Sequence, residues 1–367
     1  MIPYWLLWAF FFCGVMLSQR QPRAELQLQL QYQQYPGWMP PLGRPGLSLV
    51  AIVGLIGMTL MIGLRYDVGG DWNAYEFIFK RAGYRTFDQS LLQSDPGYAV
   101  LNWLVQQVGG EVWLVNLICA AITVWGLAAL VRREPNPWLS LLLAVPYLIV
   151  VVAMGYTRQA AALGLLMLGL ANLLRTGSLP RFIFWVALAA LFHKSAVVCL
   201  PMVAFLGNRR RIVDLALLAT AGLGLYTLLL QDSVDTLVKN YIGARYSSAG
   251  AAIRVSMSLL PGIIFLLFRR RFGFSETEEK LWRNFSLVAI GSAIALAISP
   301  SSTAVDRIAL YLLPIQFVVL ARIPGTLVQR GFGTVLVSAY SAAVLFTWLT
   351  FGVHAQHWLP YRTWLDS

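Results

Sequence analysis

The sequence predicts an all-α, polytopic integral membrane protein that forms a single membrane domain over residues 1–367. Of these residues 58% are hydrophobic and 12% are charged, whereas a soluble domain carries about 25% charged residues. The apolar residues fall in long runs, as membrane-spanning helices require. The alternating segments of about ten residues that are typical of a transmembrane barrel are not visible.

The charge and the cysteines exclude several other classes of protein. A formal net charge of +12 would suggest a nucleic-acid partner in a soluble protein. In a membrane protein the positive-inside rule explains it, because basic residues gather in short cytoplasmic loops. Cys13, Cys119 and Cys199 lie far apart within apolar runs and predict neither a disulfide nor a metal site. With no Walker A loop or dinucleotide fingerprint either, we expect no metal, no cofactor and no nucleic acid.

The first spans flank a polar linker. Residues 1–18 are apolar but lack a basic n-region and a cleavage site, which predicts a retained helix rather than a signal peptide. Residues 19–45 are rich in Gln and Pro and predict a cytoplasmic linker. Residues 47–64 predict the second span.

A polar outer loop is expected at 65–95. After it, Asp95 can cap a short amphipathic helix over 96–108, and Pro96 suits its first turn. The other apolar runs predict spans near 111–131, 138–154, 158–174, 212–230, 253–268, 284–299, 308–321 and 333–352. A further outer loop is expected at 231–252.

The apolar stretch 182–206 decides the orientation of the later spans. If it crosses the membrane once, Arg181 and the triplet at 209–211 lie on opposite sides. If it is a re-entrant hairpin, each arm has about eleven residues, or about 16 Å of helix, which is half a bilayer. All the basic clusters then become cytoplasmic. We favour the hairpin, with about ten full spans and both termini outside; a single crossing is the alternative.

Polar residues interrupt three of the spans. Arg158 and Gln159 open one span, His193-Lys194-Ser195 lies in the middle of 182–206, and Asp306-Arg307 begins the span that contains Tyr311. Ionisable groups at membrane depth are expected to face protein or water. The structural alternatives are a snorkelling anchor for Arg158, a hydrogen-bonded turn at His193 and a local ion pair for Asp306.

The segment 65–75 concentrates charge, glycine and aromatic rings at the end of the second span. It holds one cation, two carboxylates, two glycines and three aromatics, including Asp71 between Gly70 and Trp72. A carboxylate beside aromatic rings is typical of a sugar site, although Trp is also enriched at membrane interfaces. Guanidinium groups suit phosphate oxygens. The polar residues together indicate a diphosphate and a sugar, handled next to lipid.

Five motifs occur in an order that resembles a known family. They are Arg65…Gly70-Asp71-Trp72…Tyr75…Phe79, Asp95-Pro96-Gly97-Tyr98…Leu101-Asn102, Arg158-Gln159, Phe192-His193-Lys194-Ser195-Ala196 and Asp306-Arg307-Ile308-Ala309…Tyr311. With these motifs, over roughly residues 60–320, the chain resembles the EpsG-like, Wzy-type polysaccharide polymerases of bacterial inner membranes. It has Asp71-Trp72 where the family usually has Asp-Tyr, and Asp95 where the family often has Glu.

The resemblance implies a GT-C-like helical bundle and a glycosyltransferase that uses no metal. Such an enzyme joins polyprenyl-diphosphate-linked oligosaccharide repeat units on the periplasmic or outer face, with the lipid diphosphate as leaving group. The implied partners are the lipid-linked donor and acceptor, membrane lipid and a chain-length regulator. The implied location is the bacterial inner membrane.

We expect three groups of site residues on this basis. A general base is expected at His193 or Asp71, and the sequence does not separate the two. The diphosphate-binding residues are expected to be Arg158, Arg307, Lys194, Arg245 and Arg65. The sugar- or acceptor-binding residues are expected to be Trp72, Tyr75, Asp67, Asp95, Tyr98, Asn102, Gln159 and Tyr311.

Alternative functions use the same polar groups. An O-antigen-ligase-like transferase would use the same donor with another acceptor, but the modest loops after residue 231 argue against it. A transporter or flippase of lipid-linked oligosaccharides would need the basic cavity without chemistry, but no internal repeat is visible. A membrane acyltransferase would need a buried histidine open to the cytoplasm, and a purely structural scaffold would not explain the intramembrane cations.

Overall fold

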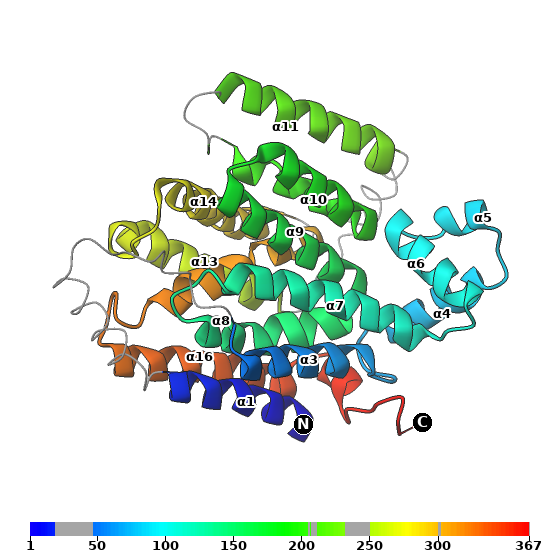
Figure 1. Cartoon of the computed structure of the whole chain (residues 1–367), viewed down its shortest axis with the longest axis horizontal. Coiled ribbons are helices and arrows are strands. Elements are labelled where there is room, and N and C mark those ends of the chain that lie inside the picture. The colour runs from blue at the N-terminus through cyan, green and yellow to red at the C-terminus, as the bar shows by residue number, and fades with distance from the viewer. Residues whose placement is uncertain (19–46, 205, 207–210, 232–249, 300–301, 367) are drawn as a thin grey trace, which may run out of the picture.

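The computed structural model describes residues 1–18, 47–204, 206, 211–231, 250–299 and 302–366, and within them it is a bundle of helices without a β-strand (Figure 1). The α-helices are α1 (Ile2–Ser18), α3 (Leu49–Gly63), α4 (Trp72–Ala82), α5 (Phe87–Leu91), α6 (Pro96–Gln107), α7 (Val112–Val131), α8 (Pro137–Ala144), α9 (Thr157–Thr176), α10 (Leu179–Phe192), α11 (Arg211–Leu225), α13 (Ala251–Phe268), α14 (Glu276–Ile298), α15 (Ser302–Ala309) and α16 (Arg330–Phe351). The 3₁₀ and π helices are η1 (Val145–Ala153), η2 (Lys194–Cys199), η3 (Pro201–Val203), η4 (Tyr226–Leu230), η7 (Arg269–Arg271), η8 (Leu310–Leu312), η9 (Gln316–Leu320) and η10 (Ala355–Trp358).

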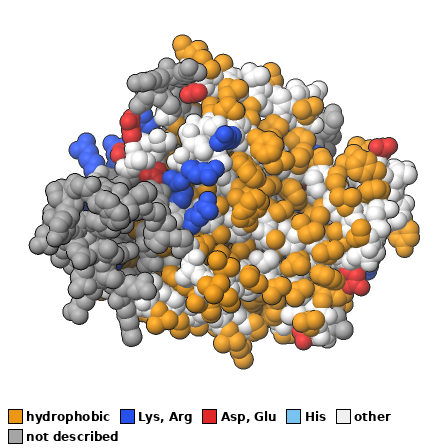
Figure 2. All heavy atoms as spheres, viewed as in Figure 1, with side chains coloured by type: hydrophobic (Ala, Val, Ile, Leu, Met, Phe, Trp, Pro, Cys, Tyr) orange, Lys and Arg blue, Asp and Glu red, His pale blue; other side chains and the backbone are white. Residues whose placement is uncertain are grey.

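Six helices in the described residues are long and apolar enough to cross a membrane. The long helices run roughly parallel, whereas α4, α5 and α6 cluster at one end of the bundle, at the right of Figure 1. On the face drawn in Figure 2, hydrophobic side chains form a broad surface, as lipid contact requires. The predicted all-α polytopic membrane fold is confirmed.

Helix α9 lies at the centre of the bundle. Of its apolar window 83% is buried, the largest share among the six candidate spans. Its approach to α7 needs glycine, because a Cβ on Gly126 would lie 2.0 Å from the carbonyl oxygen of Gly164. Small residues let membrane helices approach this closely. The first turn of α9, which carries Arg158 and Gln159, is therefore held in place on several sides.

The stretch 182–206 is not one continuous helix. Helix α10 ends at Phe192, and η2 and η3 follow a break at His193. The side-chain amide of Asn284 in α14 donates to the carbonyls of Met202 and Ala204, at 3.0 and 2.9 Å. With 14 residues, α10 is about 21 Å long, too short for a bilayer core of about 30 Å. The break supports the re-entrant hairpin, which stays a prediction.

The predicted outer loop at 65–95 contains two helices, α4 and α5, that hydropathy alone did not indicate. The amphipathic helix expected at 96–108 is α6, which starts at Pro96. Asp95 occupies the N-cap position, but its carboxylate makes no capping hydrogen bond, so the expected capping role is wrong. The predicted linker at 19–45 and most of the predicted loop at 231–252 lie outside the described residues.

Two predicted spans are irregular. The run at 138–154 forms α8 followed by the π-helical segment η1, and the whole of η1 is buried. The run at 308–321 continues from α15 through η8 and η9. The chain after α16 folds back over the segment that follows α3: the backbone N–H of Tyr66 donates to the carbonyl of Arg362, and that of Gly69 to the carbonyl of His357, both at 2.9 Å.

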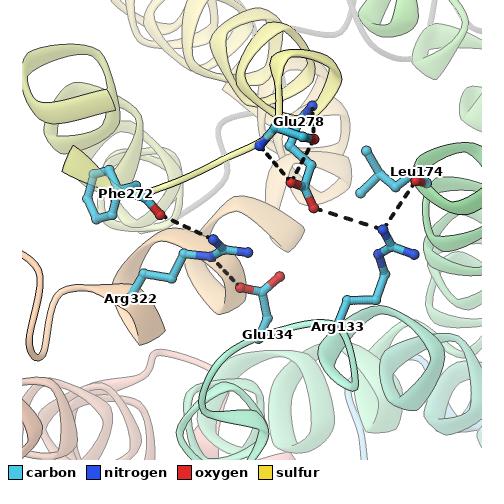
Figure 3. Close-up of polar contacts among 7 residues, drawn as sticks. Arg133, Glu134, Leu174, Phe272, Glu278 and Arg322 are labelled. Atoms are coloured by element: carbon cyan, nitrogen blue, oxygen red, sulfur yellow. Dashed lines mark hydrogen bonds and ion pairs between the residues drawn. The ribbon is translucent and has the colours of Figure 1, made fainter. Parts of the chain in front are cut away.

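A buried ion network joins the helix ends at the opposite side of the bundle (Figure 3). Arg322, after η9, pairs with Glu134 in the α7–α8 turn at 2.7 Å and donates to the carbonyl of Phe272 at 3.3 Å. Arg133 donates to the carbonyl of Leu174 near the end of α9 and lies 3.9 Å from Glu278 of α14. Two basic residues from loops expected on the cytoplasmic side, Arg133 and Arg322, thus lie at one end of the bundle, which supports the expected orientation.

Candidate active site

The polar segment after α3 requires glycine at a close approach. Gly69 has φ +111°, and a Cβ there would lie 2.2 Å from the carbonyl oxygen of Met154, just before α9. A Cβ on Gly155 would lie 2.7 Å from the ring of Trp358. That ring is buried, and its Nε1 donates to the carbonyl of Val150 at 2.7 Å. The segment is therefore packed between the start of α9 and the C-terminal residues.

Arg65 is a structural residue of this segment. Its side chain is fully buried and donates to the carbonyls of Ile62 and Val68, to Oγ1 of Thr157 at 2.7 Å and to Oδ1 of Asn116 at 3.3 Å. These partners leave little of the guanidinium group for a ligand. We infer that Arg65 positions the start of α9 and does not bind diphosphate.

The candidate site is organised by an ion pair between Arg158 and Asp95. Nη1 of Arg158 lies 2.9 Å from Oδ2 of Asp95 and 3.2 Å from Oγ of Ser94. The other carboxylate oxygen of Asp95 accepts from the backbone N–H of Lys194 at 3.3 Å. Asp95 therefore ties the first turn of α9 to the break after α10. Burial raises the pKa of Asp95, and the charge of Arg158 opposes this rise.

At that break the side chain of His193 forms a hydrogen-bond network with the hydroxyl groups of Ser195 and Tyr311. Its Nδ1 lies 2.6 Å from Oγ of Ser195 and 3.4 Å from the hydroxyl of Tyr311. The Ser195 and Tyr311 hydroxyls are 3.2 Å apart. Tyr311 is fully buried, so the group fixes one edge of the imidazole and orients the ring. The hydrogen-bonded turn that the sequence suggested is therefore present, beside the charged residues.

Helix α15 supplies the opposite wall. The backbone carbonyl of Arg307 accepts from Nε2 of Gln159 at 2.6 Å, and its guanidinium lies 5.9 Å from the ring centre of Tyr156. Asp306 pairs with Arg254 of α13 through two hydrogen bonds of 2.7 Å. Asp306 thus has a partner on another helix, which the structural alternative of a local pair with Arg307 did not anticipate.

Asp71 differs from the other carboxylates. It precedes α4, and its side chain makes no capping hydrogen bond. Among the described residues no ion pair or hydrogen bond involves its carboxylate, unlike those of Asp95 and Asp306. Burial raises the pKa of Asp71, and the charges of Arg307 and Arg158 oppose the rise. A half-buried carboxylate without a partner, within the field of two arginines, is suited to accept a proton.

The structure brings most of the expected site residues together and sets others apart. One group gathers around the first turn of α9, where its members are linked by hydrogen bonds, ion pairs or electrostatic interactions. It consists of Asp71, Asp95, Arg158, Gln159, His193, Lys194, Arg307 and Tyr311. Asp67 is exposed and lies 3.9 Å from Arg362. Arg245 lies outside the described residues.

Three of the expected sugar-binding aromatics are buried in a separate apolar cluster between α4, α6 and α7. Trp72, Tyr75 and Tyr98 are 6, 4 and 0% exposed. Asn102 is fully buried and donates to the carbonyl of Tyr98 at 2.6 Å. Rings buried to this degree do not offer a face for stacking on a sugar. Of these three rings Tyr75 lies beside the charged group, with the guanidinium of Arg158 5.9 Å from its ring centre, and Tyr311 contacts that group through His193.

Several residues of the site were not predicted. Arg254, at the start of the span predicted near 253–268, was not among the expected site residues, yet it lies in α13 and pairs with Asp306. Trp358 follows the last apolar run and carries no local signal, because its role comes from packing against Gly155. Counted by formal charge, the three basic side chains of the site exceed its two carboxyl groups by one, which favours an anion; they are Arg158, Lys194 and Arg307 against Asp71 and Asp95. Within the described residues no cluster of His, Cys, Asp or Glu could hold a metal ion.

The comparisons agree with the resemblance drawn from the motifs. No curated protein and no solved structure matches the chain. The model of the EpsG family matches residues 48–363, which include all the described residues of the candidate site. The predicted resemblance is confirmed, and the chain belongs to the EpsG family.

Proposed function

We propose that the protein is a polysaccharide polymerase that joins polyprenyl-diphosphate-linked oligosaccharide repeat units. Membership of the EpsG family supports a polymerase-like role and lipid-linked substrates in the membrane. The observation that carries the proposal is the arrangement at the start of α9. There Arg158 is held by Asp95 beside Lys194 and His193, and the Asp71 carboxylate has no described partner.

The cations would stabilise the leaving group. In a direct displacement, a hydroxyl oxygen of the acceptor attacks the anomeric carbon of the donor sugar. The bond from that carbon to the diphosphate oxygen breaks, and the lipid diphosphate leaves with the electron pair. Arg158, Arg307 and Lys194 would hold the developing charge, because fixed cations in a dry site are the largest usual catalytic contribution. Asp95 would position Arg158 for this role.

Asp71 is the base that we favour. The hydroxyl proton of the acceptor must pass to a basic group, and Asp71 and His193 are the candidates. The carboxylate of Asp95 is held by Arg158, and Nδ1 of His193 is held by Ser195 and Tyr311. The Asp71 carboxylate has no such partner among the described residues. His193 would then orient a hydroxyl or the diphosphate through its other nitrogen.

We further propose that the site faces the periplasm or outer side of a bacterial inner membrane, in a GT-C-like bundle with about ten spans. The buried ion network and the basic helix ends lie at the opposite end, which supports this orientation. A chain-length regulator stays an expected partner.

The test is a polymerisation assay. Purified protein is mixed with lipid-diphosphate-linked repeat units and no nucleotide sugar, and the products are resolved by size. A ladder spaced by whole repeat units is expected. Asp71→Asn should slow the reaction about 10²–10⁴-fold, and Arg158→Ala about 10²–10³-fold. Exposed matched controls are Asp88→Asn for the first and Arg175→Ala, at the other end of α9, for the second.

Two outcomes would contradict the proposal. A normal ladder from both site variants would remove the assigned roles. Bound but unchanged substrate with the wild-type protein would instead favour a transporter or a ligase-like transferase that needs another acceptor.

A further inference from the structure

A pocket of about 640 Å³ lies between α13 and α16, outside the site described above. Its walls are mainly apolar and include Ile253, Leu260, Val344 and Phe351. Ser256 and Ala343 also line it, and both are exposed. Pockets of about 300–1,000 Å³ are the size that binds small ligands.

One end of the pocket is polar. Arg254 lines it and is held by two hydrogen bonds to Asp306. Tyr147 of η1 lines it too; its side chain is 4% exposed, and its buried hydroxyl has no hydrogen-bond partner in the described part of the chain. A buried hydroxyl without a partner is costly and is commonly satisfied by a ligand or water. The cation and the free hydroxyl point to an anionic headgroup at this end.

The pocket reaches about halfway across a bilayer. On α13 its lining runs from Gly250 to Leu260, and on α16 from Phe351 to Tyr340. Each stretch spans about 15 Å of helix, which is half of a bilayer core of about 30 Å. The polar end lies where α13 begins, beside α15, and the apolar lining continues toward the middle of the bundle. The shape suits one apolar chain below one anionic head.

Helix α15 borders both this pocket and the candidate site. Asp306 binds Arg254 on the pocket side, and Arg307 approaches Tyr156 on the site side. Tyr156 directly precedes α9. The charges of Arg254 and Arg307 both act on Tyr156, so a headgroup at the Arg254 end would lie next to Arg307 at the edge of the candidate site.

We propose that this pocket binds the first isoprenoid units of the polyprenyl diphosphate substrate, with the diphosphate at the Arg254 end. The identity of the lipid rests on the proposed function; the location and shape of the pocket do not. A polyprenyl diphosphate has a single apolar chain, with one methyl group on each isoprene unit, and a compact doubly charged head, which the pocket matches. A bilayer phospholipid carries two acyl chains and fits it less well.

The first experiment measures lipid binding without chemistry. Full-length protein in detergent is titrated with undecaprenyl diphosphate, which carries no sugar, and the bound lipid is measured by native mass spectrometry. Ala343→Phe and Ser256→Phe fill the pocket and should weaken binding at least roughly tenfold, because several methylene groups lose their burial. Ala339→Phe is the matched control, since Ala339 is exposed on α16 but does not line the pocket. Its affinity should equal that of the wild type.

A second measurement uses the wild-type chain, so that a variant that fails to fold does not decide the result. A polyprenyl diphosphate with a diazirine on its first isoprenoid units should crosslink to peptides from 250–260 and 340–353. Crosslinks confined to other helices would overturn the proposal. So would equal affinity of folded Ala343→Phe and the wild type, or equally tight retention of phosphatidylglycerol.

The two proposals fail in different ways. If the protein binds undecaprenyl diphosphate in the pocket but makes no ladder, the proposed function fails and the lipid site stands. If Ala343→Phe polymerises as fast as the wild type at limiting donor, the lipid site fails and the polymerase stands.

Discussion

Removing one partner of the Arg322–Glu134 pair should destabilise the protein strongly. The side chains are 9 and 4% exposed, and Nε of Arg322 lies 2.7 Å from Oε2 of Glu134 (Figure 3). Breaking a buried pair in this way costs about 3–5 kcal/mol, because the other charge stays buried without a partner. In Glu134→Leu, Arg322 keeps its hydrogen bond to the carbonyl of Phe272, and its guanidinium stays 3.9 Å from the centre of the Phe274 ring. We therefore expect a loss near the lower limit, about 3 kcal/mol.

The reverse substitution should depend on pH. Burial raises the pKa of Glu134 to about 7, although Arg322 opposes the rise. In Arg322→Met, Glu134 can relieve its unpaired charge by binding a proton, so the loss at pH 6 should be smaller than the loss at pH 8. In the double variant Glu134→Leu/Arg322→Met no buried charge is left. Its stability should lie close to that of the wild type.

The assay is thermal unfolding of purified protein in one detergent at pH 8. The midpoint should fall clearly for each single variant and recover in the double variant. With about 3 kcal/mol lost in each single variant and almost none in the double, the coupling should be about 6 kcal/mol. Glu276→Ala is the control, because Glu276 is 70% exposed in its pair with Lys280 and its removal should change stability by less than about 0.5 kcal/mol. Additive losses in the double variant would refute the reasoning, since they would mean that the two charges do not depend on each other.

Three further predictions follow from other contacts. The stability of the wild type should fall relative to that of Glu134→Gln as the pH rises from about 5 to 8, by at most ~1.4 kcal/mol per pH unit. The raised pKa of Glu134 stabilises the folded state fully below the unfolded pKa of 4.5, and this stabilisation is lost as the pH rises through about 7. An equal pH dependence of the unfolding midpoint in both proteins would contradict this prediction. Gly69→Ala should lower the unfolding midpoint and the activity, whereas Gly70→Ala, whose Cβ would meet only Trp358 at 3.9 Å, should change both little. Gly126→Ala should separate α7 from α9 and reduce folded yield, while Gly57→Ala, with no atom within 4 Å, should not; equal yields would show that the glycine contact is not needed.

The sequence was sufficient for the fold class and for the groups that carry charge in the membrane. In a long apolar run the backbone must satisfy its hydrogen bonds internally, which a helix does, so hydropathy alone predicts the membrane-spanning helices. Polar residues inside such runs must find partners, so Arg158, His193 and Asp306 stood out against their surroundings. Their order along the chain also indicated the family.

Partner choice could not be predicted, because it depends on which helices pack together. Arg65 has the composition of a ligand-binding residue, yet backbone carbonyls surround it. Trp72 and Tyr98 look like a sugar platform but fill an apolar cluster. The residues after 351 carry no long apolar run, so their packing on the segment after α3 had no local signal. In each case the contacts of the side chain depend on tertiary packing, which a single sequence does not reveal.

Helix geometry explains how α15 contributes side chains both to the candidate site and to the pocket between α13 and α16. Consecutive residues on an α-helix point about 100° apart, so Asp306 and Arg307 cannot face the same partner. Asp306 turns to Arg254, which lines the pocket, while Arg307 turns to Tyr156 and the charged group at α9. Through these two adjacent residues one helix holds Arg254 on one side and presents Arg307 on the other. If the pocket binds the lipid as proposed, a diphosphate at α15 would have its apolar chain on one side and its sugar on the other.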